Sequence, residues 1–297
     1  MNLPSYRPLI GINLGNKPAL HGVPEFHFVS SDYTDAIVQA GGIPVLLPPV
    51  DKHDYDLIPS MLAPLDGLLF TGGPDLDPDT DGFKRHHSVD EMPKRRELFD
   101  RALIAEAAKR RLPVMGIGVG MQLLNVSQGG LLFLHIPEDL PRALPHYNSQ
   151  CNFSLRHRVI IEKGTLLYSV YGDNEVRVNS RHHMAVDDVA PGFIVSARCP
   201  GLSNGKNSDL NNSDSVIEAI ESTFEDWFAF GVQFHPEMKD SATHLDRQIF
   251  VEFINGVIAY KKTGRNVLAV KPHVKETAKK IRKPRGVKTS VKRDSLL

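Results

Sequence analysis

The sequence predicts an α/β fold built on a doubly wound, mostly parallel sheet with antiparallel additions. In the first half of the chain, short apolar runs bounded by Gly or Pro alternate with helical stretches, which is typical of a parallel sheet covered on both faces. From Val159 onward, strand-like runs follow one another without intervening helices. That change indicates antiparallel strands added to the same sheet.

Apolar periodicity predicts the helices. Residues 29–40 form one candidate helix, and residues 246–260 form a last helix that would close the domain. The clearest helix is 94–111, where apolar residues recur every three or four positions and so mark one face as buried. The residues of that expected face are Leu98, Ala102, Ala105, Ala108 and Leu112.

The strand-like runs define one domain over residues 1–260. In the first half they are 8–12, 43–48, 66–70 and 113–117, and in the second half 158–162, 175–180, 193–198, 216–222 and 228–234. A stretch rich in Asn, Ser and Gly, residues 201–215, predicts a polar surface loop inserted into this domain.

Composition excludes several classes of protein. The chain has 297 residues, of which 41% are hydrophobic, enough for a substantial core. It has no apolar run long enough to span a bilayer and no apolar segment of a secretory signal near the N-terminus, so we expect a cytoplasmic protein. Its two cysteines, Cys151 and Cys199, cannot build a disulfide framework and lack the spacing of a zinc site. We therefore expect neither a metal nor a cofactor.

The formal net charge of zero conceals two oppositely charged parts. Residues 261–297 hold 13 Lys or Arg against two acidic residues, a net of +11, whereas residues 1–260 hold 22 basic and 33 acidic residues, a net of −11. The basic tail has few large apolar residues, which predicts disorder. It could contact a polyanion through charge alone, or it could simply be solvated.

One stretch has the pattern of a catalytic turn. Residues 112–130, L-P-V-M-G-I-G-V-G-M-Q-L-L-N-V-S-Q-G-G, read as a buried strand, a sharp glycine turn and a helix, with Gly118 at the tip where a nucleophile would stand. A phosphate-binding loop is the alternative interpretation of these glycines. The G-x-G-x-x-G spacing fails at Met121, which disfavours that alternative.

Three polar clusters follow strand-like runs: T-G-G-P-D at 71–75, V-N-S-R-H-H at 178–183 and G-V-Q-F-H-P-E at 231–237. In a doubly wound fold these clusters and the Gly118 turn could converge at one edge of the sheet. Glu237 is close enough in sequence to orient His235 as a base. The paired glycines could offer backbone N–H groups to an oxyanion, although Gly-Gly-Pro would also make a tight turn.

In this order, these four motifs closely resemble the class I glutamine amidotransferase-like proteins, and among them the γ-glutamyl-γ-aminobutyrate hydrolase (peptidase C26) group, over residues 5–260. The resemblance implies a flavodoxin-like sheet and hydrolysis of a γ-glutamyl amide by a Cys thiolate that His235 and Glu237 activate. The oxyanion and substrate-binding residues would be Gly72, Gly73, Val119, Asp75, Asn179, His182 and His183.

The sequence departs from this family at the nucleophile. The family turn reads G-I-C-R-G-M-Q, but here Gly118 replaces the Cys and Val119 replaces the Arg, while Met184 stands where Gln is frequent. Neither remaining cysteine aligns with a catalytic position of the family. A glycine cannot form an acyl-enzyme, so the resemblance and this change together predict a member that is non-catalytic or strongly impaired.

Three functions remain open. The chain could bind a small γ-glutamyl-type carboxylate without turnover, it could hydrolyse one with a water molecule activated by His235, or it could act as an interaction protein through the basic tail. The sequence does not predict the oligomeric state.

Overall fold

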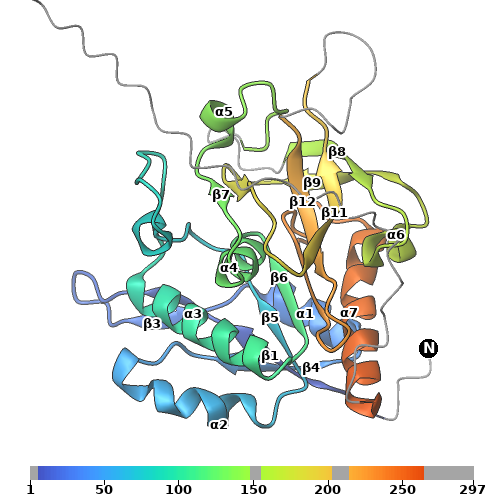
Figure 1. The fold of residues 1–297 in the computed structure, drawn as a ribbon. Coiled ribbons are helices and arrows are strands. Elements are labelled where there is room, and N and C mark those ends of the chain that lie inside the picture. Colours follow the sequence, from blue (N-terminus) through green and yellow to red (C-terminus); the bar gives the residue numbers. More distant parts are fainter. Residues whose placement is uncertain (1–5, 148–154, 203–213, 264–297) are drawn as a thin grey trace, which may run out of the picture.

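A computed structural model describes residues 6–147, 155–202 and 214–263, and these form a sheet covered by helices on both faces (Figure 1). The predicted basic tail beyond residue 263, most of the predicted loop 201–215 and Cys151 lie outside the described residues. In the described ranges, no helix is both long enough and apolar enough to cross a membrane.

The order of the elements along the chain confirms the predicted alternation of strands and helices in the first half. The strands are β1 (Leu9–Asn13), β2 (Gly15–Lys17), β3 (Phe26–Phe28), β4 (Ile43–Leu47), β5 (Gly67–Phe70), β6 (Val114–Ile117), β7 (Leu132–Phe133), β8 (Leu155–Ile161), β9 (Glu175–Ser180), β10 (Ala185–Val186), β11 (Phe193–Cys199), β12 (Val216–Ser222) and β13 (Ala229–Val232). The helices are α1 (Ser31–Gln39), α2 (Ile58–Leu62), α3 (Lys94–Lys109), α4 (Val119–Ser127), α5 (Ile136–Asp139), α6 (Leu166–Tyr171) and α7 (His244–Thr263), with 3₁₀ turns η1 (Lys52–Leu57) and η2 (Pro78–Asp81).

The sheet has a parallel half and an antiparallel half, as the sequence predicts. Its order is β4-β1-β5-β6-β13-β12-β11-β8-β9. Strands β4, β1, β5, β6 and β13 pair in parallel, whereas β12, β11, β8 and β9 are added antiparallel to β13 and to one another. Because β5, β6 and β13 are parallel neighbours, their carboxyl ends lie at the same edge of the sheet.

Two hydrophobic clusters fill the space between the sheet and its helices. On one face, α3 and α4 contribute Phe99, Leu103 and Leu123, and on the other face α1 and α7 contribute Ile37 and Phe253. In the ribbon view, α3 and α4 lie to one side of the strands and α7 to the other (Figure 1). The core therefore holds the strand ends rigidly from both faces.

The predicted buried face of α3 is only partly correct: Ala102, Ala108 and Leu112 are partly buried and pack against the core, but Ala105 is exposed. Leu98 is exposed, whereas the buried residues of this helix include Phe99, Leu103 and Ile104 together with the charged Arg96 and Asp100. Apolar spacing alone misplaces this face because three charged residues, Arg96, Glu97 and Asp100, are buried on the helix. Their burial is tolerated because they are paired: Arg96 Nε lies 3.2 Å from Asp100 Oδ2, and Glu97 pairs with Arg101.

Candidate active site

Four chain segments that are distant in sequence meet at the carboxyl edge of the parallel strands. Gly72 and Gly73 follow β5, Gly118 follows β6, and His235 follows β13, the three strands being adjacent in the sheet. Asn179 joins them from the end of β9 and ties the antiparallel half to the site. The convergence predicted from the sequence is thus present in the structure.

Gly118 has the backbone conformation of a sharp strand-to-helix turn. Its φ is +57° and its ψ is −117°, in the region that strains any residue with a Cβ. Its N–H donates to the carbonyl of Val232 at 2.9 Å, and its own carbonyl accepts from the N–H groups of Met121 and Gln122, which starts α4. A Cβ at this position would lie 3.3 Å from Cε1 and 3.5 Å from Nε2 of His235. The turn therefore keeps the geometry of a nucleophile position without a nucleophile.

His235 and Glu237 form a pair of base and orienting carboxylate. Nδ1 of His235 lies 2.8 Å from Oε1 of Glu237, and the Glu237 side chain is buried. Burial alone would lower the pKa of His235, but the Glu237 carboxylate outweighs it, so the pKa is raised. With Nδ1 directed at the carboxylate, Nε2 is the nitrogen that faces Gly118.

Asn179 holds the backbone of His235 in place. Its side-chain amide donates to the His235 carbonyl at 2.8 Å, and its side-chain oxygen accepts the His235 N–H, also at 2.8 Å. The same amide nitrogen donates to the hydroxyl of Ser241 at 3.0 Å. Asn179 is therefore a positioning residue for the base; it does not point into the pocket as a substrate ligand.

The two glycines after β5 differ in what their N–H groups do. The N–H of Gly72 donates to the hydroxyl of Tyr33 at 3.0 Å, so it is already occupied. Burial, and then the nearby Glu237 carboxylate, raise the pKa of Tyr33 well above its ordinary value, which keeps the phenol protonated. Within the described part of the chain, the N–H groups of Gly73 and Val119 have no hydrogen-bond acceptor. These two are the remaining candidates for oxyanion donors.

A buried Arg96 supports this glycine loop from beneath. Its Nη2 donates to the carbonyl of Gly72 at 2.9 Å and to Oγ1 of Thr71 at 3.2 Å. A Cβ on Gly73 would lie 2.2 Å from Nη1 of Arg96, so a larger residue there would have to displace the Arg96 guanidinium from its contacts. The Asn13 side chain completes the support: its Nδ2 donates to Oδ2 of Asp100 at 2.6 Å, and its Oδ1 accepts the Thr71 N–H at 2.7 Å. Sequence reasoning missed this support because each contact joins residues far apart in the chain.

A cavity of about 400 Å³ opens above these groups. Its lining includes Gly118, Val119 and His235. Gln122 and Gln233 also line it, and their side-chain amides hydrogen-bond to each other at 3.1 Å. Its rim carries groups of both charges: Asp75, Asp90, Arg181, His135 and His183. A small molecule bearing both a carboxylate and an amino group would find partners for each.

Asp75 and His183, both expected at the site, pair with each other across the rim. Nε2 of His183 lies 3.0 Å from Oδ2 of Asp75, which also accepts the N–H of Asp90 at 2.8 Å. Nδ1 of His183 lies 3.3 Å from Nδ1 of His135. Burial, followed by the proximity of His183, lowers the pKa of His135. The rim is therefore a connected polar chain.

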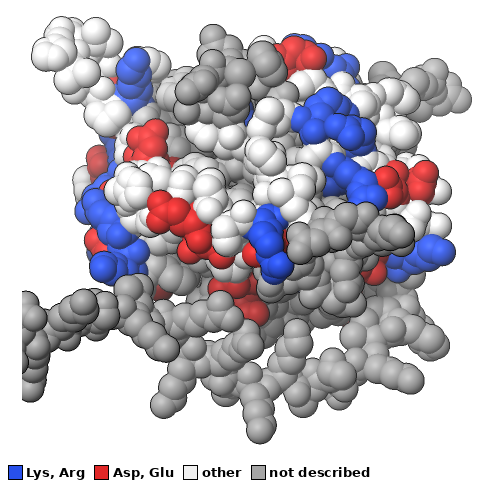
Figure 2. Space-filling model, turned by 90° about the horizontal axis from the view of Figure 1, so that it is seen from above, with Lys and Arg blue, Asp and Glu red and all other residues white. Residues whose placement is uncertain are grey.

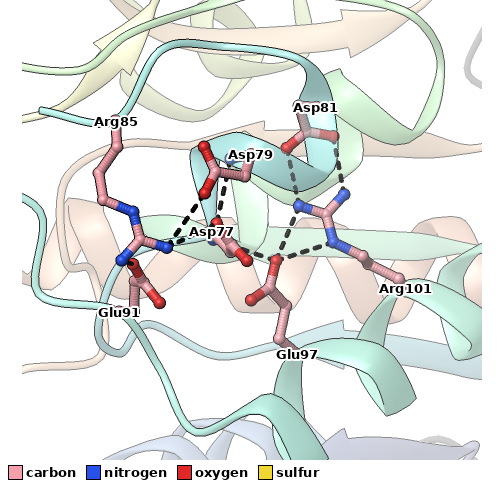
Figure 3. Close-up of polar contacts among 7 residues, drawn as sticks. All are labelled: Asp77, Asp79, Asp81, Arg85, Glu91, Glu97 and Arg101. Carbon is pink, nitrogen blue, oxygen red and sulfur yellow. Dashed lines mark hydrogen bonds and ion pairs between the residues drawn. The ribbon is translucent and has the colours of Figure 1, made fainter.

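The segment that carries Asp90 to the pocket is fixed by ion pairs (Figure 3). Arg101 of α3 makes two bonds to Asp81, at 2.8 and 2.7 Å, and also contacts Glu97 of the same helix. Arg85 reaches Asp77, Asp79 and Glu91. Together these contacts attach residues 77–91 to the helix that also supplies Arg96.

His182 differs from the other predicted site residues. Although it reaches the pocket wall, its ring is buried and its Nε2 points away from the base, lying 3.5 Å from Oε1 of the buried Glu218. Cys199 does not replace the missing thiol: it is buried in β11, where burial raises the pKa of its thiol, and it does not line the pocket. Cys151 lies outside the described residues.

Seen from above, the described surface shows Lys and Arg interspersed with Asp and Glu (Figure 2). On this face the charges do not gather by sign among the described residues. The predicted contact with a polyanion through the basic tail stays a prediction, because most of that tail lies outside the described residues.

Comparison with known proteins gives one consistent result. The family model of Peptidase C26 matches residues 8–237. The chain is 34% identical over 235 residues to a Mycobacterium tuberculosis protein assigned as a glutamine amidotransferase, covering 78% of this chain and 70% of that protein. It is 33% identical over 229 residues to the γ-glutamyl-γ-aminobutyrate hydrolase of Escherichia coli O157:H7, covering 75% of this chain and 83% of that one.

The fold is similar to that of a solved structure from Thermoplasma acidophilum, a protein assigned to GMP synthase as one of its subunits. The TM-score is 0.57 at 16% identity, over 87% of this chain and 98% of that one. This likeness supports the fold, and the sequence matches identify the family. The chain belongs to the Peptidase C26 family.

Proposed function

We propose that this protein binds a small γ-glutamyl-type carboxylate in the pocket above Gly118 and does not hydrolyse it by a thiol mechanism. The observation that carries the proposal is the relation of Gly118 to His235. A side chain at position 118 would start within reach of the base, yet glycine offers no atom that could attack a carbonyl.

The remaining parts of a γ-glutamyl site support binding. Gly73 and Val119 line the same pocket as Gly118, and Val119 is the first residue of α4, where the helix dipole favours an anion. At the rim, Arg181 offers a positive charge and Asp90 a negative one. These groups match the α-carboxylate and the α-amino group of a γ-glutamyl compound.

Loss of the cysteine also relieves strain at the turn. At φ +57°, a residue with a Cβ is strained by about 1–3 kcal/mol, which a hydrolase tolerates because the position is functional. Glycine removes that strain. A chain that keeps His235, Glu237 and Asn179 in place while losing the nucleophile is suited to recognition of the ligand.

A second candidate function uses the same residues. The space that a Cys side chain would fill lies beside Nε2 of His235, and the raised pKa of His235 suits a base that works near neutral pH. A water molecule there could attack the γ-carbonyl.

A cytoplasmic location and a polyanion contact through residues 261–297 also remain predictions from the sequence.

Binding and turnover of γ-glutamyl compounds separate the two candidates. Calorimetry and a hydrolysis assay would follow γ-glutamyl-γ-aminobutyrate, other γ-glutamyl amides and glutamine with wild type, His235→Ala and, as control, His53→Ala, whose side chain is exposed far from the pocket. The proposal expects binding without release of product in all three proteins. Turnover by wild type and His53→Ala that disappears in His235→Ala would support the water mechanism instead. Absence of binding to every compound would contradict the proposal.

A further inference from the structure

Three histidines surround one glutamate behind the wall of the pocket. His146 follows α5, His157 lies in β8, His182 follows β9, and Glu218 lies in the middle of β12. All four side chains are buried, Glu218 completely. Nε2 of the three rings lies 3.2, 3.3 and 3.5 Å from the same oxygen, Oε1 of Glu218.

The contacts of the other ring nitrogens determine which nitrogen carries the proton. Nδ1 of His146 lies 2.5 Å from the carbonyl of Leu144, and Nδ1 of His182 lies 3.0 Å from the carbonyl of Met184. Nδ1 of His157 lies 3.3 Å from the carbonyl of Arg158. Because a carbonyl only accepts hydrogen bonds, each Nδ1 is the donor, and Nε2 of each neutral ring presents a lone pair.

Three ring nitrogens and the Glu218 carboxylate therefore face one another as acceptors in a buried space. The three Nε2 atoms and both carboxylate oxygens of Glu218 have no hydrogen-bond partner among the described residues. Unpartnered polar atoms at this depth are costly and call for an explanation, such as a bound ion. One added proton would bridge only one of the three contacts with Oε1.

The spacing fits a metal ion. Zn²⁺ binds His nitrogen and carboxylate oxygen at about 2.0–2.1 Å in tetrahedral geometry, which places neighbouring ligand atoms about 3.3 Å apart. The three distances from Nε2 to Oε1 lie around that value, and all four candidate ligand atoms lie within 4.8 Å of one another. Lone pairs on three imidazoles and one carboxylate are a common ligand set for zinc.

We propose that His146, His157, His182 and Glu218 bind one Zn²⁺ ion through the three Nε2 atoms and Oε1. Four protein ligands close the coordination sphere, so the ion is structural. It joins the segment after α5, β8, β12 and the segment after β9, which begins with Arg181 and directly continues the strand that carries Asn179. The ion would thereby fix the pocket wall and the residue that orients His235. The proposal opposes the expectation from the sequence that no metal binds, which considered cysteine spacing alone.

The metal content of the purified full-length chain tests this site. The chain would be produced without a His tag, dialysed against metal-free buffer and measured by mass spectrometry of elements. Wild type should retain about one zinc per chain, and His157→Asn should retain less than one tenth of that. His87→Asn is the matched control, because His87 belongs to an exposed cluster with His86 and Glu138 at the surface. It should keep the full content.

A second measurement uses wild type alone, in case the variant does not fold. Removal of zinc by a chelator should lower the Tm, and added ZnCl₂ should restore it, because an ion that binds only the folded state stabilises it. Cobalt in place of zinc should give the intense visible bands of a tetrahedral site. A wild-type chain that retains no zinc, takes up none from ZnCl₂ and shows no change in Tm would overturn the proposal. Equal loss of zinc in His87→Asn and His157→Asn would also overturn it.

Discussion

A Cβ atom on Gly118 would lie 3.3 Å from the ring of His235, with Nε2 of the same ring 3.5 Å away. The base thus remains aligned on a position that carries no side chain. Glu237 orients the ring and Asn179 fixes its backbone, so the alignment is held by two buried residues and does not depend on the missing thiol.

Replacement of Asn179 should lower the free energy of unfolding more than replacement of Ser241, which also bonds to the Asn179 amide. Asn179→Ala removes two hydrogen bonds to the backbone of His235 and leaves a buried N–H and carbonyl without partners, which costs about 1–3 kcal/mol of unfolding free energy. Ser241→Ala is the control, since it removes only the bond to the Asn179 amide. Chemical denaturation should show the larger loss for Asn179→Ala; equal losses would refute the positioning role.

The titration of His235 should depend on Glu237. The carboxylate raises the pKa of His235, so the midpoint of its ring proton signals in NMR should lie above the ordinary value of 6.5. This group then contributes stability that is fully present below the unfolded pKa and is lost as pH rises through the folded pKa. In Glu237→Gln the charge is absent while burial remains, so the midpoint should fall below that of wild type. An unchanged midpoint would contradict the pairing.

Relative to Asp100→Asn, wild type should be more stable in mild acid than at neutral pH. Burial raises the pKa of its carboxyl to about 6, and Arg96 only partly offsets this. Because the folded pKa exceeds the ordinary 3.8, the stabilising contribution is fully present below the unfolded pKa and is lost as pH rises through about 6. Across this range the penalty on wild type relative to Asp100→Asn should grow by up to roughly 3 kcal/mol. Urea denaturation of both proteins between pH 4 and pH 8 measures it, and a constant difference would exclude this role.

The ion pairs of Arg101 in α3 should contribute more stability than the ion pair of Arg110, the residue that follows the last residue of this helix. Arg101→Met leaves Asp81 and Glu97 without their shared partner in a half-buried setting, and we expect a loss of about 2–3 kcal/mol (Figure 3). Arg110→Met breaks only an exposed pair with Glu106 and should cost less than about 1 kcal/mol. Denaturant midpoints compare the two. A smaller loss for Arg101→Met would mean that the segment 77–91 is held by other contacts.

Most of the fold could be predicted from the sequence, because strand and helix periods are local signals. The site could be predicted in part: Gly73, Gly118, His235 and Glu237 stand in motifs at strand ends, and parallel strands bring such ends together. The support beneath the site could not be predicted. Arg96 and Tyr33 contact the glycine loop from other helices, and no local pattern shows such contacts.

The His146, His157, His182 and Glu218 cluster illustrates the same limit. His182 stands in a motif with Asn179 and His183, which favoured a role in substrate binding, but the fold turns its ring toward the interior. His182 and His183 follow the end of β9, and there the two neighbouring rings contact different partners: His182 lies beside Glu218 and His183 beside Asp75. The face of α3 was mispredicted for a related reason, since pairing in space allowed charged residues to be buried.

The most direct test of the account is the gain of a thiol at position 118. Gly118→Cys and the double variant Gly118→Cys with His235→Ala would be compared with wild type for hydrolysis of γ-glutamyl-γ-aminobutyrate, with Tm measured as a control for folding. The account predicts an inert wild type, turnover in Gly118→Cys by formation and breakdown of an acyl-enzyme, and loss of that turnover when His235 is also removed. Hydrolysis by wild type at a rate that Gly118→Cys does not exceed would contradict the claim that the nucleophile is the missing part.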